Sequence, residues 1–189
     1  MSENVAYQDF QREELIGGKI VAMSPAATNH NRIALKIAVL FENYLKGKTC
    51  IPFGDGERIF LTETEHYVPD FMVVCDRSKI KPDGVHGVPD LVVEILSPST
   101  ARTDKQHKKD VYESCGVPEY WIVDPFGKSI EVYLLFDGRY SLVNVYFYHS
   151  AAELSYITAE EKAALVTEFK CHLYDDLLIR LDDIFYDLF

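Results

Sequence analysis

The chain has 189 residues, of which 48% are hydrophobic and 13% aromatic, so it is long and apolar enough for one domain with a substantial core. It contains no short repeat and no long biased segment, which excludes a solenoid, a propeller and a largely disordered chain. The formal net charge of −11 argues against a protein that coats nucleic acid.

The first predicted elements are a hairpin and a helix. Residues 14–23 form the hairpin, because Gly17 and Gly18 permit the positive φ angles of a tight turn. Apolar residues on one face predict a helix over 31–46, capped by Thr28 or Asn29 and ended by Gly47. Short strands and a polar loop follow, the strands at 50–53, 58–61 and 67–75 and the loop at 76–88.

The strongest predicted strand is 91–96, in which five aliphatic residues surround Glu94. A hydroxyl of 97–100 can cap the next helix, expected over about 102–115 and closed by Gly116. The remaining predicted elements are strands at 119–123, 129–135 and 140–148, a helix at 159–165 and a strand near 166–169. The order strand, helix, strand over 91–123 predicts a parallel crossover, and the whole pattern predicts an α/β (α+β) fold in a single domain, 1–189, with a mixed central sheet and few helices.

No targeting or membrane segment is expected. The N-terminal residues are polar and acidic, unlike a signal peptide, and the longest stretch without a charged residue, 140–152, is too short to cross a bilayer. We therefore expect a cytoplasmic protein. In a reducing cytoplasm, free buried thiols are expected for the four scattered cysteines rather than disulfides or a zinc site: Cys50, Cys75, Cys115 and Cys171.

Two acidic residues lie inside apolar strands. Glu94 interrupts the aliphatic strand 91–96, and Asp70 lies among Val68–Val74. An ionised carboxylate in such a strand costs on the order of several kcal/mol unless a partner compensates it. If the two strands pair, one divalent cation can bridge both carboxylates. The alternative is that each acid lies at an exposed strand edge or pairs with a basic residue.

A second Pro-Asp pair, Pro89-Asp90, competes with Pro69-Asp70 for this role. Asp90 and Glu94 lie four residues apart on one strand, which separates them by roughly 13 Å. That distance is too large for one ion, so Asp70 is the preferred partner of Glu94, and Asp90 is expected to begin or cap its strand.

These residues carry a resemblance to a known family. Pro69-Asp70, followed 24 positions later by Glu94, resembles the PD-(D/E)XK signature of restriction-endonuclease-like proteins. More specifically, the chain is similar to the Uma family of predicted endonucleases, most densely over 68–125. The segments that carry the similarity are PDLVVEILSPST (89–100), GVPEYWIVDP (116–125), ELIGG (14–18), His30 and LDDIF (181–185). The resemblance implies a restriction-endonuclease-like core.

The chain departs from the superfamily pattern at Leu96, where a lysine is expected two residues after the glutamate. The Uma-type pattern has its lysine on the following helix, within Asp104-x-x-x-Lys108-x-x-x-Tyr112, and these three residues share a helix face. A long side chain at Lys108 can reach back to the acids. Without the resemblance, Lys108 would be a solvent-facing lysine paired with Asp104.

The implied activity is hydrolysis of phosphodiester bonds in nucleic acid, with DNA favoured, by a Mg²⁺- or Mn²⁺-dependent endonuclease. Asp70, Glu94 and the main-chain carbonyl of Ile95 would hold the metal, and Lys108 would orient water or stabilise charge on the phosphate. Three further candidates have ordinary alternatives: Glu14 extends the acidic cluster or begins the hairpin, His30 contacts the site or caps the helix, and Tyr112 packs in the core with its hydroxyl near the site.

Basic residues suggest where nucleic acid binds. They gather in two groups, Arg77, Lys79 and Lys81, and Arg102, Lys105, Lys108 and Lys109. Arg102, Lys105 and Lys109 are the candidate phosphate contacts, for a transient interaction, although a solvated surface has the same pattern. The alternative function is an inactive nuclease fold that binds nucleic acid or a protein, and the apolar C-terminal tail suits a homodimer interface equally well.

Overall fold

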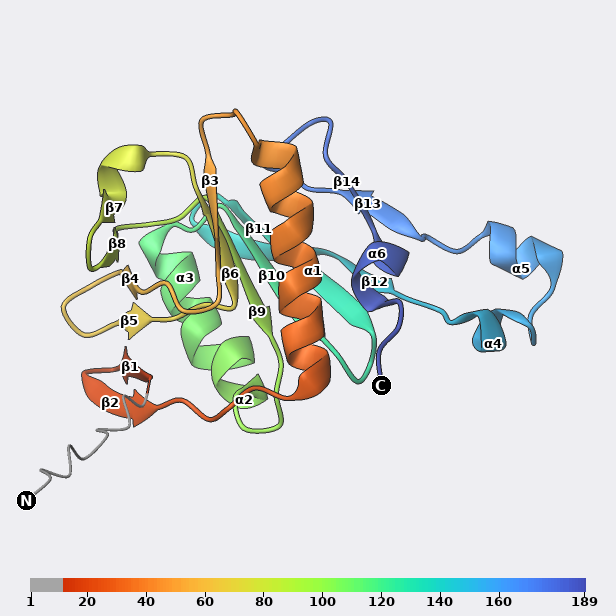
Figure 1. The fold of residues 1–189 in the computed structure, drawn as a ribbon, viewed down its shortest axis with the longest axis horizontal. Helices are drawn as coiled ribbons and strands as arrows, with labels where there is room; N and C mark the ends of the chain where they lie inside the picture. Colours follow the sequence, from red (N-terminus) through yellow and green to blue (C-terminus); the bar gives the residue numbers. More distant parts are fainter. Residues whose placement is uncertain (1–11) are drawn as a thin grey trace, which may run out of the picture.

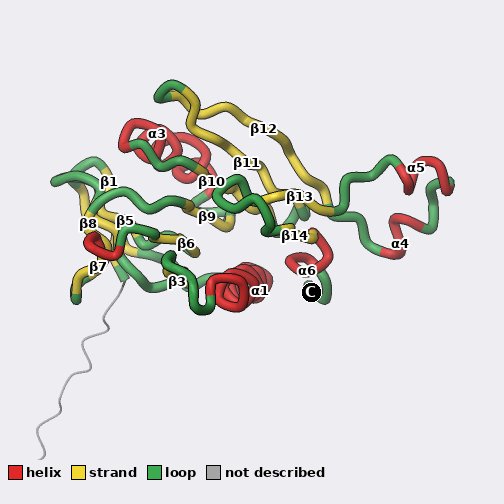
Figure 2. The backbone as a smooth tube through the Cα atoms, turned by 90° about the horizontal axis from the view of Figure 1, so that it is seen from above, coloured by secondary structure: helices red, strands yellow, loops and turns green. Residues whose placement is uncertain are grey.

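The computed structural model describes residues 12–189, and its elements form three layers (Figures 1 and 2). A six-stranded central sheet is covered on one face by helix α1 (Thr28–Leu45) and on the other by the helical segment 101–115. This segment comprises α2 (Ala101–Thr103), the π-helical turn η2 (Asp104–Lys108) and α3 (Lys109–Cys115). In Figure 2, α1 and α3 lie on opposite sides of the strands. The predicted α+β fold is confirmed.

The central sheet has the strand order β12-β11-β10-β9-β6-β3. In chain order its strands are β3 (Ile51–Gly54), β6 (Phe71–Val74), β9 (Leu91–Ile95), β10 (Glu119–Asp124), β11 (Ser129–Phe136) and β12 (Arg139–Phe147). Strand β9 is parallel to β10 and antiparallel to β6. The sheet is therefore mixed, and the crossover predicted over 91–123 is present.

A second sheet lies at the N-terminal side, with the order β2-β1-β5-β4-β8-β7. Its strands are β1 (Glu13–Ile16), β2 (Lys19–Ala22), β4 (Ile59–Phe60), β5 (His66–Tyr67), β7 (Ile80–Lys81) and β8 (Gly84–His86). Strands β1 and β2 form the predicted hairpin, and its turn residues Gly17 and Gly18 have φ angles of 56° and 75°. These positive angles are the reason for glycine at both positions.

The C-terminal part adds a two-stranded sheet and short helices. These elements are α4 (Ala151–Leu154), α5 (Ala159–Ala163), β13 (Glu168–Lys170), β14 (Leu178–Arg180) and α6 (Leu181–Phe185). Figure 1 shows α4 and α5 projecting away from the central sheet, whereas β13, β14 and α6 lie next to it. Among residues 12–189, no helix combines the length and the apolar character needed to cross a membrane.

Residues of β6 and β9 alternate between two apolar cores, since successive side chains of a strand point to opposite faces. Odd-numbered residues, such as Phe71 and Val93, join the core under α1. Even-numbered residues, such as Met72 and Val92, join the core under α3. Glu94 has the parity of Val92, so it faces the helical segment 101–115. The alternation thus places an acidic side chain beneath that segment.

Two predicted helix caps are not formed. Helix α1 begins at Thr28, and Ala27 occupies its cap position without a side-chain hydrogen bond, so neither Thr28 nor Asn29 caps it. Thr100 holds the cap position of α2, also without a side-chain cap bond. Gly116 ends α3 in the left-handed conformation with a φ angle of 90°, as predicted.

Two predictions about the strands and loops between α1 and β9 are wrong. The strand predicted over 67–75 is divided into β5 and β6, and Pro69 lies in the break because proline has no N–H for a ladder. The segment 76–88, predicted as a loop, contains the 3₁₀ helix η1 (Arg77–Lys79), β7 and β8. Strand β8 is held by pairing with β4, a contact between segments that local composition does not encode.

The expectation of four free thiols is also wrong. Cys50 and Cys75 form a disulfide, while Cys115 and Cys171 are free. The pairing follows from the register of β3 and β6, in which Ile51 lies opposite Val74, so the next residues outward, Cys50 and Cys75, also face each other. The spacing of the cysteines along the chain could not reveal this register.

Reduction of the disulfide is expected to destabilise the protein. The bond closes a loop with a sequence separation of 25, for which restriction of the unfolded chain contributes about 3.5 kcal/mol. This contribution is measured by urea unfolding of the wild type with and without dithiothreitol. Unfolding of the Cys50→Ala/Cys75→Ala variant measures it independently. An unchanged free energy of unfolding after complete reduction would contradict it.

Candidate functional site

A cavity of about 790 Å³ opens beside the carboxyl end of β9. It is bounded by the β1–β2 hairpin, the residues 23–27 before α1 and the turn 97–100 before α2. Asp70, Glu94 and Lys108 all line it, together with Glu14 and His30. Residues predicted from separate parts of the sequence are thus brought to one cavity.

Lys108 lies at the centre of the acidic residues and is only 4% exposed. Its Nζ atom is 2.8 Å from Glu14 Oε1, 3.1 Å from Glu94 Oε1 and 3.7 Å from Asp104 Oδ1. Burial disfavours the ammonium form, but the three carboxylates outweigh burial and raise the pKa of Lys108 well above its ordinary value. Lys108 is therefore positively charged at neutral pH.

Glu94 is buried between β9 and the helical segment. Its Oε1 atom accepts hydrogen bonds from Lys108 Nζ and, at 2.8 Å, from the Tyr112 hydroxyl. Burial raises the pKa of Glu94 well above its ordinary value; Lys108 opposes this shift, and the neighbouring carboxyls of Asp104, Asp70 and Glu14 add to it. Glu94 therefore binds a proton more readily than an exposed glutamate does.

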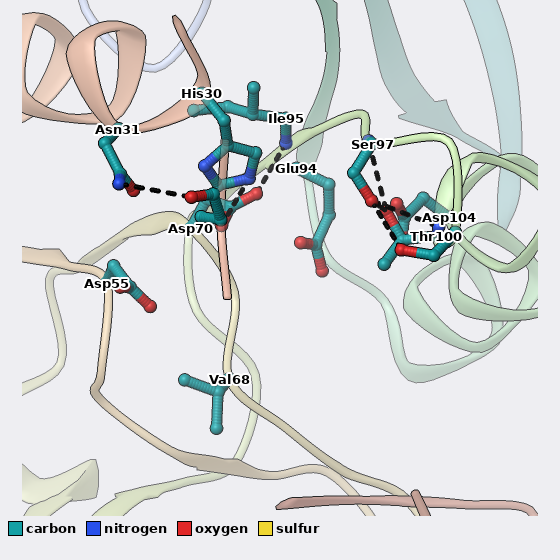
Figure 3. A network of polar contacts seen from close by, with 12 residues as sticks. His30, Asn31, Asp55, Val68, Asp70, Glu94, Ile95, Ser97, Thr100 and Asp104 are labelled. Atoms are coloured by element: carbon teal, nitrogen blue, oxygen red, sulfur yellow. Dashed lines mark hydrogen bonds and ion pairs between the residues drawn. The ribbon is translucent and has the colours of Figure 1, made fainter. Parts of the chain in front are cut away.

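Asp70 directly precedes β6, and the register that pairs Phe71 with Val93 brings it level with Glu94. Its Oδ2 atom accepts from Ile95 N at 2.7 Å, and its Oδ1 atom is 3.2 Å from His30 Nε2. Burial lowers the pKa of His30, but Asp70 outweighs burial, so the pKa is raised. In the view of Figure 3, the Glu94 carboxylate lies between Asp70 on one side and Thr100 and Asp104 on the other.

The structure places the three further candidates close to this group. Glu14 lies in hairpin strand β1, and it belongs to the acidic cluster because its Oε1 atom accepts from Lys108 Nζ at 2.8 Å. The same oxygen also accepts from Val68 N at 2.9 Å. His30 lies in the first turn of α1 and contacts Asp70. Tyr112 packs in the core under α3 while its hydroxyl reaches Glu94.

Asp104 is a member of the cluster that the sequence analysis missed. It was named in the Asp104-x-x-x-Lys108-x-x-x-Tyr112 pattern and as the partner of a solvent-facing Lys108, but it was given no role in the site. In the structure it is 2% exposed and lines the cavity. Burial raises its pKa, against the opposing effect of Lys108. Its Oδ1 atom has no hydrogen-bond partner among residues 12–189. The four-residue spacing from Lys108 was the available signal, and the π-helical winding of η2, a feature common at functional sites, was not predictable.

Comparison with known proteins identifies the family. Residues 5–160 match the model of the Uma2 family, described as a putative restriction endonuclease. The chain belongs to the Uma2 family. The resemblance to Uma-type proteins that the sequence motifs indicated is thereby confirmed.

Two relatives of this Uma2 chain come from Synechocystis sp. The uncharacterized protein slr1290 is 33% identical over 135 residues, which cover 69% of this chain and 71% of that protein. The uncharacterized protein sll1609 is 30% identical over 130 residues, covering 67% and 73%, respectively. These relatives support the family assignment.

A solved structure shares the fold. The crystal structure of a putative nuclease belonging to DUF820 from Anabaena variabilis superposes with a TM-score of 0.68. The match covers 92% of this Uma2 chain and 89% of that chain, at 20% sequence identity. At this identity the likeness shows a common fold, and the site is argued from this chain's own residues.

The Uma2 site suits a divalent cation in charge and in donor type. Four buried carboxyl groups, those of Glu14, Asp70, Glu94 and Asp104, line the same cavity as the ammonium of Lys108. Carboxylate oxygens are the donors that Mg²⁺ and Mn²⁺ prefer. No set of three or more His, Cys, Asp or Glu side chains in the described part of the chain is arranged to hold a metal by itself. Mg²⁺ commonly uses one or two carboxylates together with water and substrate phosphates, so a site with few protein ligands is consistent with its usual coordination.

The residues predicted to bind nucleic acid lie outside the cavity lining. Lys105 Nζ is 2.6 Å from Glu131 Oε1, and Lys109 Nζ lies 5.1 Å from the centre of the Tyr133 ring. Arg102 donates to Gln106 over 3.4 Å. All three belong to the helical segment 101–115, which also carries Asp104 and Lys108.

Proposed function

We propose that this protein is a divalent-cation-dependent endonuclease that hydrolyses phosphodiester bonds in DNA. The observation that carries the proposal is the buried cluster in which Lys108 contacts Glu94 and Glu14 at a cavity shared with Asp70. Buried acids with strongly perturbed pKa values in a cavity are typical of functional sites. Membership of Uma2 adds support, because that family is described as a putative restriction endonuclease.

Asp70, Glu94 and the main-chain carbonyl of Ile95 are the proposed ligands for Mg²⁺ or Mn²⁺. A bound cation would supply the Lewis acidity that polarises the phosphate and neutralises charge developing on it. His30 orients Asp70 through its contact with Oδ1, and the Ile95 N–H fixes Oδ2. The Tyr112 hydroxyl holds Glu94 in the same way. The chain thus fixes both carboxylates before substrate binds.

Lys108 acts as a fixed positive charge and hydrogen-bond donor toward the phosphate. Its raised pKa keeps it protonated at neutral pH, so it does not serve as a general base in this arrangement. Glu14 holds the ammonium from the side of the hairpin. Arg102, Lys105 and Lys109 supply weak phosphate contacts outside the cavity, which suit transient binding by an acidic protein.

The alternative function is a nuclease fold that binds nucleic acid or a protein without cutting. Leu96, at the position of the usual superfamily lysine, favours it, as does the engagement of Lys108 by Glu14 and Glu94 as a buried ion cluster. The two functions differ in cation binding and in cleavage, so one set of measurements separates them.

Adding Mn²⁺ or Mg²⁺ is expected to raise the melting temperature by roughly 5–10 °C at 100 times the dissociation constant. Under the same conditions the protein is expected to cleave DNA. Both effects should be measured for the wild type and for Asp70→Asn, with single- and double-stranded DNA and RNA as substrates and EDTA as control. A thermal shift lost in Asp70→Asn supports the metal site. Absence of both a shift and cleavage in the wild type would refute the nuclease proposal.

A further inference from the structure

A further buried carboxylate, that of Glu65, lies outside the cavity lining and has hydrogen-bonding partners from three segments. Glu65 directly precedes β5 and is 8% exposed. It accepts hydrogen bonds from the Tyr67 hydroxyl and, at 3.0 Å, from Gly17 N. His107 Nε2 lies 3.2 Å from both of its carboxylate oxygens. Glu65 does not line the cavity, and the chemistry described above does not use it.

Each residue that contacts Glu65 is connected, along the chain or by a contact, to a member of the Lys108 cluster, which comprises Lys108, Glu14, Glu94 and Asp104. Gly17 is the turn of the hairpin whose strand β1 carries Glu14. Tyr67 precedes Val68, whose N–H holds Glu14, and its ring centre is 5.3 Å from Lys108 Nζ. His107 is the neighbour of Lys108 on η2. One carboxylate therefore connects the hairpin, β5 and the π-helical turn at the place where they converge on Lys108.

The charge of Glu65 fits this role. Burial opposes its ionised form, but the hydrogen bonds from Tyr67 and Gly17 and the contact with His107 outweigh burial and lower the pKa of Glu65. Glu65 is thus an anion at neutral pH, and hydrogen bonds to an ionised acceptor are stronger than those between neutral groups.

We propose that Glu65 is a positioning residue that fixes Lys108 and Glu14 in the site by tying together the Gly17 turn, Tyr67 and His107. The proposal rests on the proposed nuclease function for its effect on activity, but the position of Lys108 can be tested without it. Outer residues that orient site groups commonly change activity by about 10- to 100-fold when they are removed.

The chain offers a matched control for Glu65. Glu131 accepts from the hydroxyl of Tyr133, two residues later, and pairs with Lys105 on the same helical segment. It therefore repeats the arrangement of Glu65, in which the acid contacts the tyrosine two residues later and a basic residue of η2. It has no contact with the hairpin or with Lys108 among its hydrogen bonds and ion pairs within residues 12–189.

The test compares Glu65→Ala, Glu65→Gln, His107→Ala and Glu131→Ala as full-length proteins. Amine acetylation by acetic anhydride, quantified for each lysine by mass spectrometry, reports how well Lys108 is protected. We expect Glu65→Ala to increase acetylation of Lys108 and to lower kcat in Mn²⁺, each by about tenfold or more, with KM for DNA unchanged. Glu65→Gln restores most of both properties, because its amide oxygen still accepts from Gly17 N.

His107→Ala keeps the proposal testable if Glu65→Ala fails to fold, since the His107 side chain is 44% exposed. His107→Ala should increase acetylation of Lys108 less than Glu65→Ala does, and its melting temperature should equal that of the wild type. Wild-type acetylation of Lys108 and wild-type kcat in both Glu65→Ala and His107→Ala would overturn the positioning role, as would an equal effect in Glu131→Ala. If the wild type shows neither a thermal shift with cation nor cleavage of DNA, the nuclease proposal fails, while the acetylation of Lys108 still decides the role of Glu65.

Discussion

Replacing Glu94 with glutamine is expected to lower kcat/KM for DNA cleavage by about 10²- to 10³-fold, the size of effect seen when one electrostatic contact to a transition state is removed. The amide keeps the shape of the side chain and its contact with Tyr112, but it is a weaker ligand for a cation. Lys108 retains Glu14 and Asp104 as partners, so the fold should persist. Cleavage kinetics in Mn²⁺ measure the loss of activity, and a melting curve measures whether the fold persists.

Glu131→Gln serves as the control for Glu94→Gln, because Glu131 also lies in a strand of the central sheet but outside the cavity lining. Its kcat should equal that of the wild type. Equal cleavage by wild type and Glu94→Gln would eliminate Glu94 as a cation ligand. Equal loss in Glu94→Gln and Glu131→Gln would point to damage of the sheet instead.

Among the substitutions proposed at this site, Lys108→Met is expected to cause the largest loss in the free energy of unfolding. The variant leaves Glu14, Glu94 and Asp104 buried without the lysine ammonium group that all three contact. Removing one partner of a buried ion pair costs about 3–5 kcal/mol. Urea unfolding at pH 8 measures this loss, and cleavage activity should fall with it. Methionine keeps most of the side-chain volume, so packing changes contribute little.

The stability deficit of Lys108→Met should shrink on acidification. Burial raises the pKa of Glu94 and of Asp104 in the fold even with Lys108 present, and loss of the ammonium raises both further. A carboxyl whose pKa is higher in the folded state binds protons more tightly there, so folding stability falls as pH rises through that pKa and recovers toward pH 5. Mn²⁺ should also restore stability at pH 8. A deficit that is identical at pH 5 and pH 8, with and without Mn²⁺, would show that charge is not its cause.

The central pair of the site was accessible from sequence because each acid lies within an apolar run of residues. Nothing in the neighbouring sequence compensates the charge of Asp70 or Glu94, so the sequence favoured a role that the two acids share. The pairing of β6 with β9 places Asp70 opposite Glu94. The strand–helix–strand order also placed Lys108 on the helix that follows Glu94. Their placement could therefore be anticipated, while their roles remain proposals.

The rest depended on contacts between distant segments. Asp104 resembled a surface residue in the sequence, yet it is buried together with Lys108 on the π-helical turn η2. Glu65 lies in the polar run TETEH, where nothing distinguishes a buried acid from an exposed one. The pairing of Cys50 with Cys75 required the register of β3 and β6. Each feature is set by tertiary packing, which local propensity does not contain.

The Lys108–Glu14 contact joins residues 94 positions apart, and it has a consequence for synthesis of the protein. A nascent chain carries Glu14 and Asp70 well before Lys108 has been added, whereas Glu94 precedes Lys108 by only 14 residues. These carboxylates can only be drawn together and neutralised after the helix that bears the ammonium has emerged and the amino-terminal hairpin has docked on it. The capacity to cut DNA would therefore belong to the finished polypeptide and to no truncated product that ends before this helix.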